Sequence, residues 1–92
     1  MAENIFLEVV TPERNVVSER AQIVMAPGSL GEFGVLPGHT SFITTLKDGT
    51  LKYRDESGVE HRYDVFGGFA EALPDKVTIL AENAIEAAVV DV

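Results

Sequence analysis

The chain has 92 residues and a mass of 10.0 kDa, and 46% of its residues are hydrophobic. This length allows one small domain, and this composition is too apolar for a disordered chain. The formal net charge is −8, and Lys and Arg are not clustered, which argues against binding to nucleic acid or, through a basic patch, to anionic lipid. The sequence contains no cysteine, so it offers no disulfide, thiolate nucleophile or Cys-ligated metal.

Nothing in the sequence favours insertion into a membrane. The longest segment without a charged residue, 33–46, is interrupted by glycine and proline and is too short to cross a bilayer. The N-terminus lacks the basic region of a signal peptide. We therefore expect a soluble, acidic, cytoplasmic domain.

Short β-branched and aromatic segments separated by turn residues occupy the first half of the chain. They predict strands at 5–10, 16–17, 21–26 and 42–46, with turns at Thr11-Pro12, Pro27-Gly28 and 47–49.

The segment 51–65 shows the clearest hairpin pattern. Apolar and charged residues alternate on both sides of a turn at 55–58, as in two half-buried antiparallel strands. We expect Lys52 or Arg54 to pair across the hairpin with Glu60 or Asp64.

Gly67-Gly68 ends that hairpin, and 69–73 and 76–80 form another around Pro74-Asp75. In the segment 81–92, Asn83 and Glu86 have the spacing of a capping box, which predicts at most a short helical turn. Many short strands without a linker predict a single all-β domain over 1–92, folded as a sandwich or barrel.

Few residues are arranged for chemistry. His39 and His61 lie far apart, without the spacing of metal ligands, and His61 is expected to be partly buried with a hydrogen-bond partner. The nucleophile motif Gly-x-Ser-x-Gly is missing, and the glycines at 28, 31 and 34 precede no helix that could bind phosphate. We expect no catalytic residue, cofactor or metal.

The segment 26–40 carries the most information, because it holds four glycines and two prolines. One interpretation is a long connection between sheets, with a type II turn at Pro37-Gly38. The other is an interaction surface, since long ordered loops often carry function. Leu30, Phe33, Val35 and Leu36 are too apolar for a free loop, so some should join the core and others contact a partner.

The run 31–39 (GEFGVLPGH) resembles the signature of the epsilon subunit of bacterial F-type ATP synthase. The segment 7–14 resembles the first strand and turn of that family, and Gly67-Gly68-Phe69 resembles its glycine pair. The segment 76–82 resembles its last strand. Order and spacing match throughout 5–84, so the resemblance covers nearly the whole chain.

The resemblance implies a flattened ten-stranded β-sandwich, with two five-stranded sheets, in the central stalk. There the subunit bridges gamma and the ring of c subunits on the cytoplasmic side of the bacterial plasma membrane. It couples proton-driven rotation of the ring to the catalytic head and performs no chemistry itself. A contiguous apolar patch is expected where gamma binds.

The interface residues implied by the resemblance lie in one segment. Glu32 would offer a carboxylate to a basic side chain of the ring, Phe33 and Leu36 would support that contact, and His39 would lie near gamma. The full set is Gly28, Gly31, Glu32, Phe33, Gly34, Leu36, Pro37, Gly38 and His39.

The chain departs from the family pattern at its end. Family members continue into a two-helix hairpin that can inhibit ATP hydrolysis and, in some members, bind ATP. Residues 84–92 do not match the segment that leads into those helices. We therefore expect an N-terminal β-sandwich domain that lacks the helical domain and does not bind ATP.

Two other functions stay open. Biotinyl and lipoyl carrier domains are also acidic and all-β, and Asp75-Lys76-Val77 resembles their lysine-bearing hairpin, although that lysine lies near mid-chain in carrier domains. A metal-dependent sandwich enzyme would have to retain a metal at His39 or His61.

Overall fold

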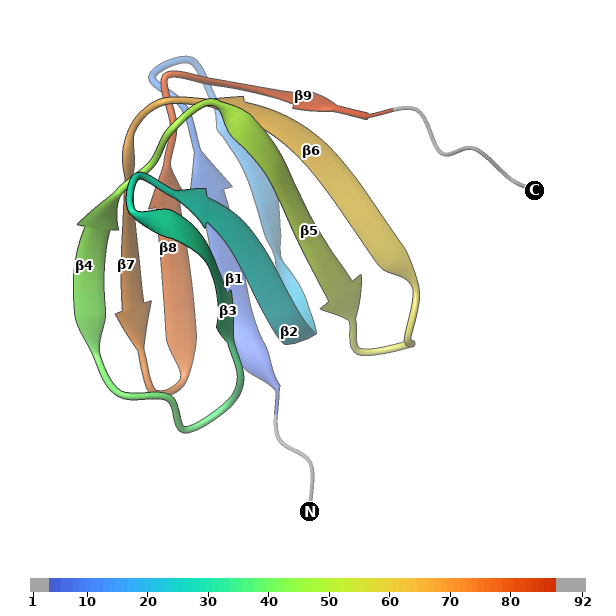
Figure 1. The fold of residues 1–92 in the computed structure, drawn as a ribbon. Coiled ribbons are helices and arrows are strands. Elements are labelled where there is room, and N and C mark those ends of the chain that lie inside the picture. Colours follow the sequence, from blue (N-terminus) through green and yellow to red (C-terminus); the bar gives the residue numbers. More distant parts are fainter. Residues whose placement is uncertain (1–3, 88–92) are drawn as a thin grey trace.

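The computed structural model describes residues 4–87, which form nine β-strands and no helix (Figure 1). The strands are β1 (Ile5–Val10), β2 (Asn15–Gly28), β3 (Gly31–Val35), β4 (Phe42–Thr45), β5 (Gly49–Asp55), β6 (Glu60–Phe66), β7 (Phe69–Leu73), β8 (Lys76–Leu80) and β9 (Asn83–Glu86).

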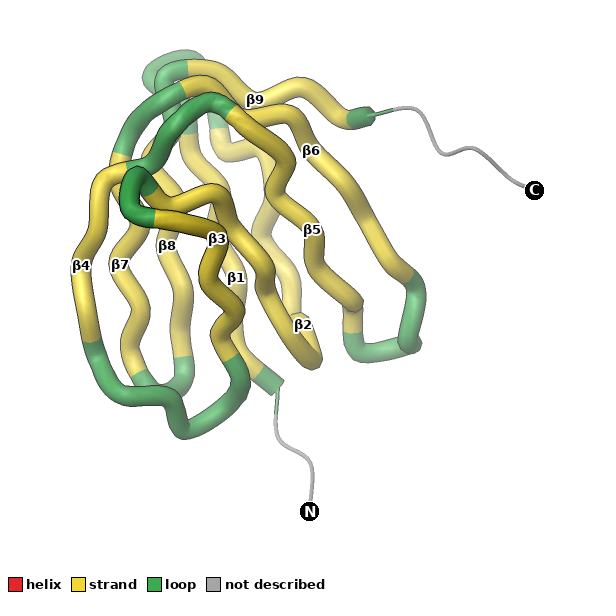
Figure 2. The backbone as a smooth tube through the Cα atoms, viewed as in Figure 1, coloured by secondary structure: helices red, strands yellow, loops and turns green. Residues whose placement is uncertain are grey.

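The strands form one hydrogen-bonded sheet that folds over itself as a sandwich (Figure 2). Its order is β4-β7-β8-β1-β2-β5-β6-β9, and β3 pairs with β2 beside this path. Neighbours are antiparallel except β1 and β8, which run parallel. Within residues 4–87 the end strands β4 and β9 do not pair with each other, so the sheet is not closed into a barrel.

The all-β sandwich predicted from the sequence is confirmed, but the expected ten strands in two separate sheets are not found in the described residues. The segments predicted as strands at 16–17 and 21–26 belong to the single long strand β2. A register shift between Ala21 and Ile23 bends β2 without ending it. As a result β2 belongs to both layers.

The predicted helical turn at the C-terminal end is wrong for residues 83–86, which form strand β9 against β6. Ala84 is buried in the core, and the Asn83 side chain accepts a hydrogen bond from the backbone N–H of Ala84 (2.9 Å). Packing and pairing with β6 therefore outweigh the local capping pattern. Val89, which the helix would have used, lies outside the described residues.

The core is a single cluster of alternating strand residues that meet between the two layers. Its largest fully buried side chains are Ile5, Leu7, Leu51, Ile79, Val9, Val24, Val35, Val65 and Val77.

The predicted hairpin 51–65 is confirmed as β5 and β6. Arg54 lies directly opposite Glu60, as expected, whereas Lys52 lies opposite Arg62 and the ion pair of Glu60 is not made across the hairpin. Glu60 pairs with Arg62 of its own strand (Nε to Oε2, 2.7 Å).

Gly67-Gly68 connects β6 to β7 where the chain passes close to the end of β8. Both residues have positive φ, +65° and +108°. A Cβ atom on Gly68 would lie 1.8 Å from the carbonyl oxygen of Leu80. Only glycine fits there.

We predict that Gly68→Ala destabilises the domain far more than Gly58→Ala. Gly58 also has a positive φ (+88°), but a Cβ there would meet nothing within 4 Å, so it adds only strain of about 1 kcal/mol. Gly68→Ala adds a backbone clash and should cost about 3 kcal/mol or more. Chemical denaturation measures both. Equal losses of stability would contradict the close approach.

Candidate interaction surfaces

Residues 26–40 do not form the long connection that was one interpretation of the sequence. They form the end of β2, a two-residue turn at Ser29-Leu30, the strand β3 and a second turn. The first turn is fixed to the end of β4, because the Ser29 N–H donates to the Thr45 carbonyl (2.9 Å) and the Thr45 hydroxyl donates to Ser29 Oγ (2.7 Å). The β2–β3 hairpin therefore projects from the sheet but is anchored to β4 by these two hydrogen bonds.

The apolar residues of this segment divide as expected between core and surface. Val35 is fully buried, and Phe33 packs on the core with its ring edge-on to Phe42 (centroids 5.1 Å apart). Leu30, at the tip of the hairpin, is 100% exposed, and Leu36 is also exposed. Two apolar side chains are thus left for a partner.

The predicted type II turn at Pro37-Gly38 is confirmed. The His39 N–H donates to the Leu36 carbonyl (3.2 Å), and Gly38 has a φ of +83°. The His39 ring lies against Phe42 (centroids 5.3 Å apart), and Nδ1 lies 2.7 Å from the Thr40 carbonyl oxygen.

The glycines predicted as interface residues have different roles. A Cβ on Gly28 would lie 2.7 Å from the Gly31 carbonyl oxygen, and one on Gly34 would lie 2.8 Å from Met25 Sδ. Gly28 is therefore required by packing against the backbone, whereas a side chain at position 34 would only displace the flexible side chain of Met25. Glu32 is exposed and lies opposite Pro27 in the register, on the outer face of the sheet.

A second surface was predicted only as an unplaced apolar patch. It lies on the outer side of β4, β7 and β8, at the left of Figure 1, and we call it the apolar face: Ile43, Phe69, Leu73 and Leu80. Ile43 is 72% exposed and Phe69 55%.

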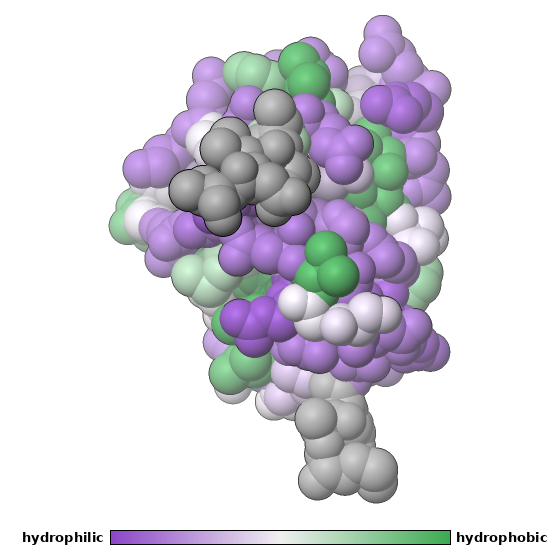
Figure 3. All heavy atoms as spheres, turned by 90° about the vertical axis from the view of Figure 1, so that its right-hand side faces the viewer, coloured by the Kyte–Doolittle hydropathy of each residue, from purple (hydrophilic) through white to green (hydrophobic). Residues whose placement is uncertain are grey.

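One row of the apolar face is continuous across the strands, whereas Ile43 lies opposite Glu71 and Leu73 opposite Lys76. Phe69 pairs directly with Leu80, and Leu80 with Val10 of β1. Beside this row lies an open hollow of about 620 Å³, whose lining includes Val10, Thr45, Phe69 and Leu80. By contrast, the side of the molecule that faces right in Figure 1 is mainly hydrophilic, with isolated hydrophobic groups (Figure 3). An apolar row of this kind is typical of a surface that a partner covers.

Comparison with known proteins places this fold. Residues 4–87 match the family model of the ATP synthase, Delta/Epsilon chain, beta-sandwich domain. The chain belongs to this family.

Relatives of this chain include epsilon chains of bacterial ATP synthases. The ATP synthase epsilon chain of Desulforapulum autotrophicum is 70% identical over 84 residues, which cover 91% of this chain and 62% of that protein. That of Syntrophobacter fumaroxidans is 54% identical over 92 residues, which cover 100% of this chain and 68% of that protein. The chain thus spans about three fifths of the length of the first of these curated relatives.

Solved structures agree with the family. A chain of the Euglena gracilis mitochondrial ATP synthase, in a structure of OSCP, F1 and the c-ring, has a TM-score of 0.85 and 27% identity; 90% of this chain and 53% of that chain are covered. A chain in a structure of the Tetrahymena thermophila mitochondrial ATP synthase central stalk and c-ring has a TM-score of 0.74 and 13% identity. The match covers 90% of this chain and 66% of that chain, and it supports the fold alone.

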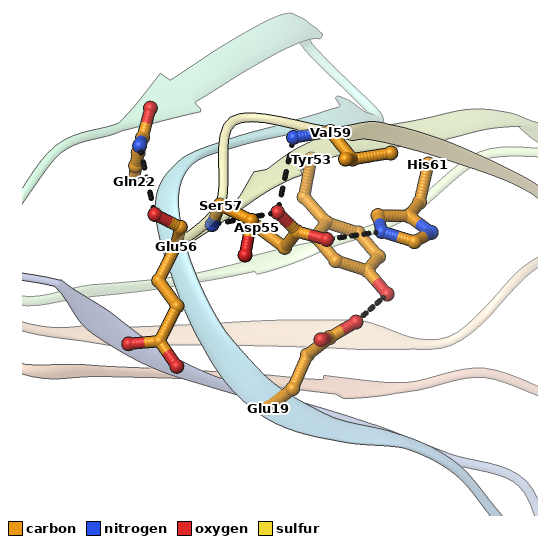
Figure 4. A network of polar contacts seen from close by, with 8 residues as sticks. All are labelled: Glu19, Gln22, Tyr53, Asp55, Glu56, Ser57, Val59 and His61. Atoms are coloured by element: carbon orange, nitrogen blue, oxygen red, sulfur yellow. Dashed lines mark hydrogen bonds and ion pairs between the residues drawn. The ribbon is translucent and has the colours of Figure 1, made fainter.

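A network of hydrogen bonds lies at the turn between β5 and β6 (Figure 4). The Asp55 carboxylate accepts hydrogen bonds from the backbone N–H groups of Ser57 (2.8 Å) and Val59 (3.0 Å). It also accepts a hydrogen bond from His61 Nε2 (2.7 Å). The His61 ring stacks on Tyr53 (ring centroids 4.8 Å apart). The prediction that His61 is partly buried with a hydrogen-bond partner is confirmed. The network fixes the β5–β6 turn.

Two pKa values follow from this network. The hydrogen bond from His61, and then that from the Val59 N–H, lowers the pKa of Asp55 below its ordinary value. Burial, and then the hydrogen bond that the Tyr53 hydroxyl donates to Glu19, raises the pKa of Tyr53. The lowered pKa favours the ionised form of Asp55, and the raised pKa favours the neutral form of Tyr53.

The described residues contain little that resembles an active site. Within 4–87 no group of three or more His, Asp or Glu side chains could hold a metal ion, and no helix there could span a membrane. Lys76, which a carrier domain would modify, is half-buried and pairs with Glu8 (Nζ to Oε1, 3.0 Å). The candidate functional surfaces of the described residues are therefore the β2–β3 hairpin and the apolar face.

We predict that Asp55→Asn flattens the acid limb of the stability curve. Because the folded pKa of Asp55 is lowered, its ionised form stabilises the domain above its unfolded value of 3.8, and this stabilisation is lost as the pH falls through the folded pKa. Urea unfolding between pH 2 and pH 7 measures the effect. Asp48→Asn, at an exposed position, is the control, and an identical pH profile for wild type and Asp55→Asn would contradict the role of the network.

Proposed function

We propose that this chain is a non-catalytic rotor subunit of a proton-translocating F-type ATP synthase, which couples rotation of the c ring to the catalytic head. The observation that carries this proposal is a rigid sandwich of the epsilon family that bears two separate projecting or apolar surfaces. Similarity to a chain of an ATP synthase structure that contains the c-ring supports it.

The β2–β3 hairpin is the proposed contact with the c ring. Its tip carries the exposed Leu30, and the exposed Glu32 is available to a basic side chain of the ring. An exposed ion pair contributes only about 0–1 kcal/mol, so Glu32 sets the register of the contact while the rest of the interface supplies the affinity.

The apolar face is the proposed contact with gamma. Phe69 and Leu80 offer adjacent apolar side chains, and the hollow next to them can accept an apolar side chain from the partner. Leu36 and His39 lie on the connection between β3 and β4, at the border of the two surfaces. In the assembled enzyme this arrangement would lie on the cytoplasmic side of the bacterial plasma membrane.

The function as a biotinyl or lipoyl carrier finds no support in the structure. Lys76 begins a core strand and is paired with Glu8 across to β1, whereas a carrier lysine must reach an active site freely.

We predict that Leu80→Ala weakens binding to gamma by about tenfold, because truncation of a buried interface anchor costs more than about 1 kcal/mol. Leu80 is 48% exposed in the free domain, so the fold should be retained. Ile85→Ala is the matched control, since Ile85 is 52% exposed on β9, away from the apolar face.

Titration of purified gamma with each variant, followed by calorimetry, tests this assignment. Leu80→Ala should bind more weakly than wild type while Ile85→Ala binds normally. If both variants bind gamma equally well, the apolar face is not the gamma contact.

A further inference from the structure

Strand β3 is an edge strand. It pairs with β2 on one side, and among residues 4–87 no strand pairs with its other side. An edge of this kind presents backbone N–H and C=O groups that a strand of another chain can pair with.

The register shows which groups face outward. Glu32 lies opposite Pro27, which has no N–H, and the Pro27 carbonyl accepts from the Lys47 N–H (3.0 Å) on the side away from β3. The pair Pro27–Glu32 is therefore a pair without hydrogen bonds across the hairpin. In such a pair the backbone groups of both residues point away from each other. Glu32, and two residues later Gly34, thus direct their N–H and C=O groups to the free edge.

This edge is open to an approaching chain. Glu32 and Gly34 are both exposed, and Gly34 has no side chain to obstruct a neighbour. Natural edge strands are blunted by shortness, charged side chains, proline or a bulge. The five residues of β3 (GEFGV) contain no lysine or proline and pair with β2 without a register shift. Apart from its short length, the edge is protected only by the charge of Glu32, which a basic strand would neutralise.

We propose that the free edge of β3 binds an extended, basic segment of a neighbouring rotor polypeptide as an added β-strand. The backbone of Glu32 and Gly34 supplies the hydrogen bonds, and the Glu32 carboxylate favours a basic residue beside it. This inference rests on the proposed rotor function. A second copy of this chain fits less well, because each copy carries a net charge of −8.

Proline at position 32 tests the backbone contact separately from the charge. Glu32→Gln removes only the charge, whereas Glu32→Pro also removes an N–H that the domain itself does not use. We expect Glu32→Pro to bind the gamma–c-ring rotor about tenfold more weakly than Glu32→Gln.

Glu86→Pro is the matched control for a proline on an edge strand. The Ala87 N–H donates to the Arg62 carbonyl (2.9 Å), so the N–H of the adjacent Glu86 points away from β6. This variant should bind like wild type, and thermal unfolding should show all three variants folded.

Hydrogen exchange on the wild-type chain gives a second test that needs no variant. The amides of Glu32 and Gly34 should exchange rapidly in the free chain and at least about tenfold more slowly in the rotor assembly. Equal binding of Glu32→Pro and Glu32→Gln, or unprotected amides in a bound chain, would overturn the added strand and leave the rotor function standing. A wild-type chain that does not bind the rotor would overturn both.

Discussion

The structure depends on the continuity of strand β2. Its first half pairs with β1, and its second half pairs with β3 and β5, so one chain segment belongs to both layers of the sandwich. The register shift between Ala21 and Ile23 provides the bend that makes this possible. Because both layers share strand β2, they cannot slide past each other without breaking the backbone hydrogen bonds that β2 makes with β1, β3 and β5. A stiff body of this kind is suited to transmit torque.

The same continuity joins the two proposed interaction surfaces. Ser29, at the tip of the β2–β3 hairpin, is bound to Thr45 through a backbone and a side-chain hydrogen bond. Thr45 in turn pairs with Phe69 of the apolar face. A force applied at the tip therefore reaches the apolar face through hydrogen bonds within one sheet. This short path gives a structural reason for the two surfaces to lie on one small domain.

Sequence reasoning succeeded where the signal was local. The alternation in 51–65 predicted β5 and β6, and the Pro37-Gly38 pair predicted its turn, because side-chain period and backbone φ are fixed by neighbouring residues. It missed the hairpin at Ser29-Leu30, whose tip lacks the usual Asn-Gly type of signal. It also read Asn83–Glu86 as a helical cap, since pairing with β6 cannot be seen in the sequence. The apolar face was unplaced because Phe69 and Leu80 look like core residues until the strand register is known.

We propose that this one domain contacts two different neighbours at two defined places. The 92 residues contain no cysteine, so each introduced cysteine is the only one in this sequence. In the assembled ATP synthase, a cross-linker on Leu30→Cys should capture a c subunit, and one on Leu80→Cys should capture gamma. Capture of the same subunit from both positions, or of neither subunit from an assembled complex, would contradict two separate contacts.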